Sequence, residues 1–140
     1  MDDRAVSTTV SYALNLAVAT MLVAGVLTAT SGVVVDQRGQ AARSELRVVG
    51  QRLAADIGTA DRLANAGGET VSVTSPLPDS VAGVSYTVEV TGSRLVLEAN
   101  FQSVSVTVPY RTNHTVESTT VAGGELHVRL AADGDLEVGS

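Results

Sequence analysis

The chain contains no cysteine, no lysine and no tryptophan, and phenylalanine occurs once in its 140 residues. Without cysteine, neither a disulfide framework nor a thiolate metal site can hold the fold together. All nine basic residues are arginine, and fifteen acidic residues bring the net charge to −6. Because phosphate binding requires clustered basic side chains, this charge balance argues against nucleic acid as a partner.

Charge is also absent from residues 5–35, where every side chain is apolar or uncharged. A helix needs about 20 mostly apolar residues to cross the hydrocarbon core of a bilayer, and this run is longer. A soluble core helix of such length would need a large surrounding protein, which the rest of a 140-residue chain does not supply. We therefore expect a membrane-spanning helix, best insulated over residues 13–35. The apolar run is longer than the roughly 7–15 residues typical of a conventional cleaved signal peptide.

Residues 36–66 have the pattern of an amphipathic helix. Apolar residues recur every three or four positions and form one stripe: Ala42, Leu46, Val49, Leu53, Ile57, Ala60 and Ala64. Nothing in the sequence requires a break from the preceding apolar helix, and residues 65–68 supply a C-terminal stop. Three interpretations of the stripe remain open: it covers a sheet of the same chain, it docks on neighbouring subunits, or, less well supported, it forms a coiled coil.

The period changes to two after Gly68, which predicts a β domain over residues 69–140. Five or six short strands are expected, mostly antiparallel and rich in Val and Thr, one of them over residues 114–121. Turn sequences stand between them at residues 75–79, 91–93, 123–124 and 133–135, and residues 136–140 are a candidate edge strand. Val84, Tyr86, Val88 and Val90 are expected to share one face. The predicted fold class is α+β: a long N-terminal helix, half transmembrane and half amphipathic, with a small antiparallel β-sheet head that the helix covers.

We find no catalytic or metal-binding constellation in the sequence. His114 and His127 have no second ligand at a recognisable spacing and are interpreted as solvated strand histidines. Asp56 and Asp61 are five apart, so they do not share a helix face as an acid–base pair would. Residues 133–135, Asp-Gly-Asp, are better explained as a hairpin turn than as a calcium loop. The sequence thus predicts a protein that is not an enzyme and uses no cofactor, metal or small-molecule substrate.

One covalent modification is indicated by the sequence. Asn113-His114-Thr115 is an N-glycosylation triplet placed between two predicted strands, where a glycan would project into solvent. Asn113 is therefore a glycosylation candidate, on the condition that the β domain lies outside the cell.

The first residues resemble the class III signal segment of haloarchaeal type IV pilins and pilin-like proteins. Asp3-Arg4-Ala5-Val6-Ser7 precedes the long apolar helix, and the acidic, lysine-free composition is also similar to that of salt-adapted haloarchaeal proteins. The resemblance implies a leader at residues 1–5 and an assembly helix at residues 6–35. Arg4 would be recognised by a prepilin peptidase, which would cut after Ala5 and leave Val6 as the N-terminus. Thr8 stands where haloarchaeal pilins commonly have Pro, and Val10 stands where many bacterial pilins have Glu, which favours a minor or pilin-like subunit.

From this resemblance we expect a structural subunit or assembly partner of a type IV pilus-like surface filament, anchored in the cell membrane with an external head. Its partners would be the membrane, the prepilin peptidase and other pilin-like subunits, contacted through the N-terminal helix. The alternative is a single-pass anchored β domain that binds a partner protein at the cell surface without polymerising. The positive-inside rule opposes the external head, because Arg4 stands against Arg38, Arg43, Arg47 and Arg52 beyond the apolar run.

Overall fold

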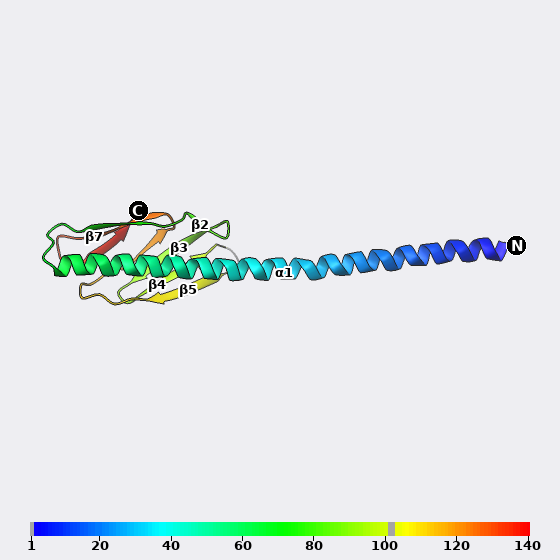
Figure 1. Ribbon diagram of the computed structural model, residues 1–140, viewed down its shortest axis with the longest axis horizontal. Coiled ribbons are helices and arrows are strands. Elements are labelled where there is room, and N and C mark those ends of the chain that lie inside the picture. Colours follow the sequence, from blue (N-terminus) through cyan, green and yellow to red (C-terminus); the bar gives the residue numbers. More distant parts are fainter. Residues whose placement is uncertain (1, 101–102) are drawn as a thin grey trace. The chain divides into compact units, whose positions relative to one another are not determined.

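The computed structural model describes residues 2–100 and 103–140 and contains one long helix followed by eight strands (Figure 1). The helix is α1 (Asp2–Asn65), and it is unbroken between the apolar and amphipathic segments. The strands are β1 (Ser72–Pro76), β2 (Ser80–Val81), β3 (Val84–Thr91), β4 (Arg94–Ala99), β5 (Val104–Pro109), β6 (Thr119–Ala122), β7 (Glu125–Leu130) and β8 (Leu136–Gly139). The predicted α+β class is confirmed.

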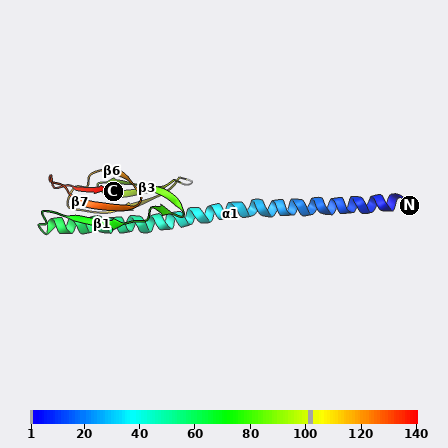
Figure 2. The ribbon, with the colours of Figure 1, turned by 90° about the horizontal axis from the view of Figure 1, so that it is seen from above.

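The chain divides into two compact units, Met1–Gln37 and Arg38–Ser140. We call the second unit the head. It contains the C-terminal part of α1, which lies along one face of the strands in Figures 1 and 2. The amphipathic half of the helix thus folds with the β strands, as the apolar stripe requires.

The stripe on α1 is buried against the strands of the head. Leu46, Leu53 and Ile57 are fully buried, and Ala64 is the partly buried end of the stripe. This confirms the interpretation in which the helix covers a sheet of its own chain. At Gly50 the helix approaches the sheet so closely that a Cβ atom there would lie 2.7 Å from Val108 Cγ2.

The predicted helix stop is also confirmed. The Gly68 amide donates to the Leu63 carbonyl at 3.2 Å, and the Gly67 amide donates to the Ala64 carbonyl at 3.1 Å. These two bonds are those of a Schellman motif. Its left-handed position is occupied by Gly67 with φ of 88°, a conformation that glycine adopts without the steric cost of a side chain.

The strands form two antiparallel sheets. One has the order β1-β7-β8, and the other has the order β2-β3-β4-β5, with β6 also paired to β3. Tyr86, Val88 and Val90 of β3 are buried and Val84 is half-buried, so the predicted face is confirmed. The turn at residues 92–93 joins β3 to β4, and residues 131–135 form the predicted hairpin turn between β7 and β8.

Three details of the strand prediction are wrong. The head has eight strands: the candidate edge strand at residues 136–140 is confirmed as β8, but the two-residue β2 was not predicted. The segment before β2 was expected to turn at Ser75, yet β1 continues through Pro76, since an edge strand tolerates proline. Residues 114–118 were expected to be strand, but only Val116 forms a bridge, to Leu136, because the preceding backbone is bound to the helix by Asp61.

Candidate functional site

The most conspicuous candidate site is the apolar part of α1. From Val6 to Val34 its large apolar side chains are between 44% and 74% exposed, including Met21 at 74%. The most apolar 18-residue window has a mean hydropathy of 2.0, and none of it is buried. Soluble proteins rarely expose a continuous apolar surface of this extent. This helix is long and apolar enough to cross a membrane.

All four hydroxyl groups of residues 13–35 are satisfied within the helix. Thr20 donates to the Leu16 carbonyl at 2.7 Å, and Ser31 donates to the Leu27 carbonyl at 2.8 Å. Thr28 and Thr30 make the same contact four residues back. Because an unpaired hydroxyl costs several kcal/mol in hydrocarbon, on the order of 4 or more, these bonds reduce the cost of placing the segment in lipid.

The predicted processing residues Arg4, Ala5 and Val6 lie in the first turns of α1 and are exposed. The carbonyl groups of Arg4 and Ala5 each accept a hydroxyl bond, from Thr8 and Thr9, both at 2.9 Å. The predicted cutting point after Ala5 is therefore accessible but helical. A peptidase that reads an extended substrate would have to unwind this turn.

Asp61 binds the backbone of the first two residues of the glycosylation triplet. Its side chain is buried, and Oδ1 accepts the backbone N–H groups of Asn113 at 3.0 Å and His114 at 2.9 Å. The same oxygen lies 2.9 Å from His114 Nδ1, and Asn65 donates to Oδ2 at 3.2 Å. Burial raises the pKa of Asp61, but the bonds from His114 and Asn113 outweigh it and hold the pKa below its ordinary value.

This geometry leaves the Asn113 side chain exposed on a backbone that is held in place. Thr115, the third residue of the triplet, is exposed as well. The prediction that a glycan on Asn113 would project into solvent is compatible with this geometry. The Asp61 cluster itself was missed by sequence reasoning, which had set Asp61 aside because it does not pair with Asp56.

The two histidines make separate contacts. His114 lies in a bend rather than a strand and is bound to Asp61, so its interpretation as a solvated strand residue is wrong. His127 lies in β7, with Nδ1 3.2 Å from Thr74 Oγ1. Among residues 2–100 and 103–140 no group of three His, Cys, Asp or Glu side chains could hold a metal ion.

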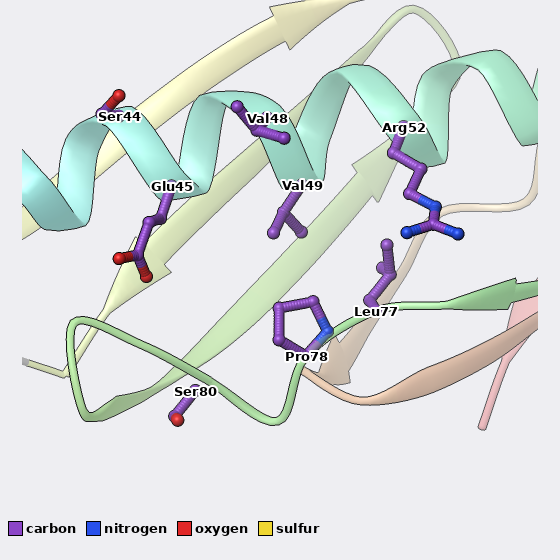
Figure 3. Close-up of a pocket in the computed structure, with 8 residues that line it drawn as sticks. All are labelled: Ser44, Glu45, Val48, Val49, Arg52, Leu77, Pro78 and Ser80. Atoms are coloured by element: carbon purple, nitrogen blue, oxygen red, sulfur yellow. The ribbon is translucent and has the colours of Figure 1, made fainter.

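A shallow groove of about 350 Å³ runs between α1 and the chain that follows β1 (Figure 3). Val48, Val49, Leu77 and Pro78 give it an apolar lining. Figure 3 shows Glu45 and Arg52 extending from the same helix. Glu45 is committed to structure, because its Oε2 accepts the Ala82 amide at 2.7 Å. The groove can receive an apolar side chain but presents no nucleophile paired with a base among the residues that line it.

Comparison with known proteins identifies one family. A family model described as "Family of unknown function (DUF7266)" matches residues 1–139. No curated protein and no solved structure matches the chain.

Proposed function

We propose that this chain, which belongs to the DUF7266 family, is a membrane-anchored, pilin-like structural protein that serves as a minor subunit or assembly partner of a type IV pilus-like surface filament. The observation that supports this function best is the exposed, uncharged segment of α1, whose helix continues without a break into the part that covers the β head. One helix thereby supplies both an anchor and the support of a folded domain.

Assembly would exchange lipid contacts of the apolar segment for contacts with other helices. Lipid is as apolar as a leucine side chain, so association within it depends on close packing at small residues. Gly25 and Ala29 are spaced by four on one helix face, and the space around Gly25 is open. This face is the best candidate for a close helix–helix contact.

The proposal places the head outside the cell. The resemblance of residues 3–7 to a class III signal segment supports this orientation, because prepilin-type cutting after Ala5 would take place on the cytoplasmic side. Arg38, Arg43, Arg47 and Arg52 follow the apolar run and favour the opposite orientation by the positive-inside rule. Recovery of the chain from surface filaments would therefore establish the external head against the arginine count.

The test is recovery of the chain from surface filaments sheared from its native host under piliating conditions. The wild-type chain is expected in both the filament and membrane fractions. Gly25→Leu, which fills the small-residue face while keeping the segment apolar, should reduce filament recovery at least fivefold without changing membrane recovery. Val23→Leu, on the far side of the same turn, is the matched control and should change neither. A chain confined to membranes, with Met1 retained, would contradict assembly and favour the anchored binding module.

A further inference from the structure

The outer edge of β5 is an unpaired strand edge of the head. β5 is the last strand of its sheet, and Figure 1 shows no strand beyond it. The Tyr110 N–H donates to the Ser93 carbonyl. Because every second residue of an antiparallel strand bonds to the same neighbour, the backbones of Val104, Val106 and Val108 also bond to β4. The N–H and C=O groups of Ser105 and Thr107 therefore point away from the sheet. No residue in the described ranges accepts these two N–H groups.

The other strand edges of the head are shorter or already engaged. Beside β8, residues 115–117 are bound to Leu136 by two backbone bonds. β1 is one residue shorter than β5, and its outward-facing positions end at Pro76, which has no N–H to donate. β2 and β6 are two and four residues long, whereas β5 has six residues and no charged side chain to repel another strand.

The apolar core is least completely covered along this edge. Val106 is 9% exposed, and Val108 and Tyr110 are each 8% exposed, the highest values among the core residues. A strand added beside β5 would cover these three side chains as well as pair the free backbone groups. The edge therefore offers both hydrogen bonds and apolar contact to an incoming strand.

We propose that β5 pairs antiparallel with β5 of a second copy of this chain, about a two-fold axis at Val106. In this register Ser105 lies opposite Thr107 of the second copy, and Thr107 opposite Ser105 of the second copy. Both residues then exchange N–H and C=O bonds, so that all four free N–H groups are used. Moving the centre to Thr107 would place Ser105 opposite Pro109, which has no N–H to donate.

The charges around β5 favour the same arrangement. Arg94 and Arg111 lie near the Pro109 end, and Glu98 is paired with Ser105 near the other end. In an antiparallel pair the arginine end of one strand comes beside the glutamate end of the other. Opposite charges are thus gathered on each side of the contact and like charges are kept apart.

The symmetry decides which copies can meet. Two antiparallel neighbours in one sheet are related by an axis perpendicular to the sheet, and the helix of the head lies along the sheet face. The rotation reverses this helix, so the two residues 38 leave the pair at opposite ends. Chains that enter the pair from opposite ends favour a contact between heads anchored in two facing membranes over one between neighbours in the same membrane, an inference that rests on the external head of the proposed function.

Cysteine cross-linking between two vesicle populations tests this pairing, because the native chain has no cysteine. Full-length Ser105→Cys is reconstituted in one population and full-length Thr107→Cys in the other, and the two are mixed under mild oxidation. The Cα atoms of Ser105 and of Thr107 in the second copy would be about 5.5 Å apart, within disulfide range. The same residue in the two copies, for example Ser105 and Ser105, would lie on a diagonal of about 8 Å, outside that range. The mixture should give at least five times more disulfide dimer than either variant alone.

Thr87→Cys, on the solvent face of the central strand β3, is the matched control and should give background yields in both populations. Vesicles that carry the wild-type chain should cluster. Replacing that chain with Thr107→Lys should reduce the clustering at least fivefold, and replacing it with Thr87→Lys should not. A mixture no better than the Thr87→Cys control would overturn the pairing. Cross-linking when both variants are reconstituted in the same vesicles, but not when they are in separate populations, would overturn the facing-membrane contact. Neither result bears on whether the N-terminus is Val6, so a failure here is distinguishable from a failure of the pilin-like function.

Discussion

Replacing Gly50 with alanine sets helix propensity against packing at the point where α1 meets the sheet. Alanine is favoured over glycine inside a helix by about 1 kcal/mol. The new Cβ, however, would lie 2.7 Å from Val108 Cγ2 and 2.8 Å from Leu97 Cδ1. Contacts this short require the helix or the strands to shift, and overpacking of a core costs about 1–3 kcal/mol. Val108 is β-branched and cannot turn away freely, so we expect the upper part of that range.

The expected net effect of Gly50→Ala is a loss of about 1–2 kcal/mol in the free energy of unfolding of the head, with a Tm lower by about 4–16 °C. Gly58→Ala is the matched control on the same helix, because the nearest atom to its added Cβ is Arg62 Nη1 at 3.8 Å. This control should instead raise stability by about 0.5–1 kcal/mol.

The assay is thermal unfolding of the full-length variants in detergent micelles, followed by circular dichroism. Val108→Ala removes the clashing methyl groups, so the cost of Gly50→Ala should fall by about 1 kcal/mol in that background. If Gly50→Ala were as stable as wild type, or if Gly58→Ala lost as much stability, the close approach of helix and sheet would be refuted.

Three further predictions concern other parts of the chain. Asp61→Ala should lower the free energy of unfolding by about 3 kcal/mol, since two backbone N–H groups lose their acceptor. Because the pKa of Asp61 is lowered from 3.8, the ionised side chain stabilises the fold above pH 3.8, and this stabilisation should be lost as the pH falls through the folded-state pKa. In denaturant titrations at several pH values, Asp61→Asn should remove this pH dependence. Burial raises the pKa of Tyr110 from 10.0 to about 12, so the free energy of unfolding should fall as pH rises through that interval. The fall should be smaller in Tyr110→Phe, and the same pH dependence in both proteins would contradict this. Val23→Arg should cost about 3 kcal/mol of membrane insertion and shift the chain out of carbonate-washed membranes, whereas Val48→Arg, on the exposed face of the head helix, should not.

Periodicity predicted the parts of the fold in which a regular face is buried. The stripe from Ala42 to Ala64 and the alternation of β3 each specify which side chains enter the core, and both were confirmed. The helix stop was predictable because Gly67 is suited to the left-handed position of the cap. These features depend on residues close together in the sequence, which pattern reasoning can read.

Contacts between distant residues carried no such signal. Asp61 and His114 are 53 positions apart, and neither the charge of Asp61 nor its place beside the stripe indicates which backbone it binds. That contact holds residues 113–114 in a bend and so defeats the predicted strand there. The groove depends likewise on the distance between α1 and residues 77–80, which the strand order sets and the sequence pattern does not show.

The sheet edges are a third case of this kind. β5 reads as an ordinary alternating strand, and its sequence does not say whether one or both sides are paired. Only the order β2-β3-β4-β5 identifies it as an edge and assigns the free groups to Ser105 and Thr107.

Intact mass and N-terminal peptide mapping of the protein from its own host's membranes and filaments test the central claim most directly. We predict a mature N-terminus at Val6, which would establish processing after Ala5, place the head outside and leave the apolar helix on the mature subunit. The mass of the Asn113 peptide, read in the same experiment, would show whether that side chain carries a glycan. An N-terminus at Met1 or Asp2 in every fraction would contradict the pilin-like function and leave a simple membrane anchor for the β head.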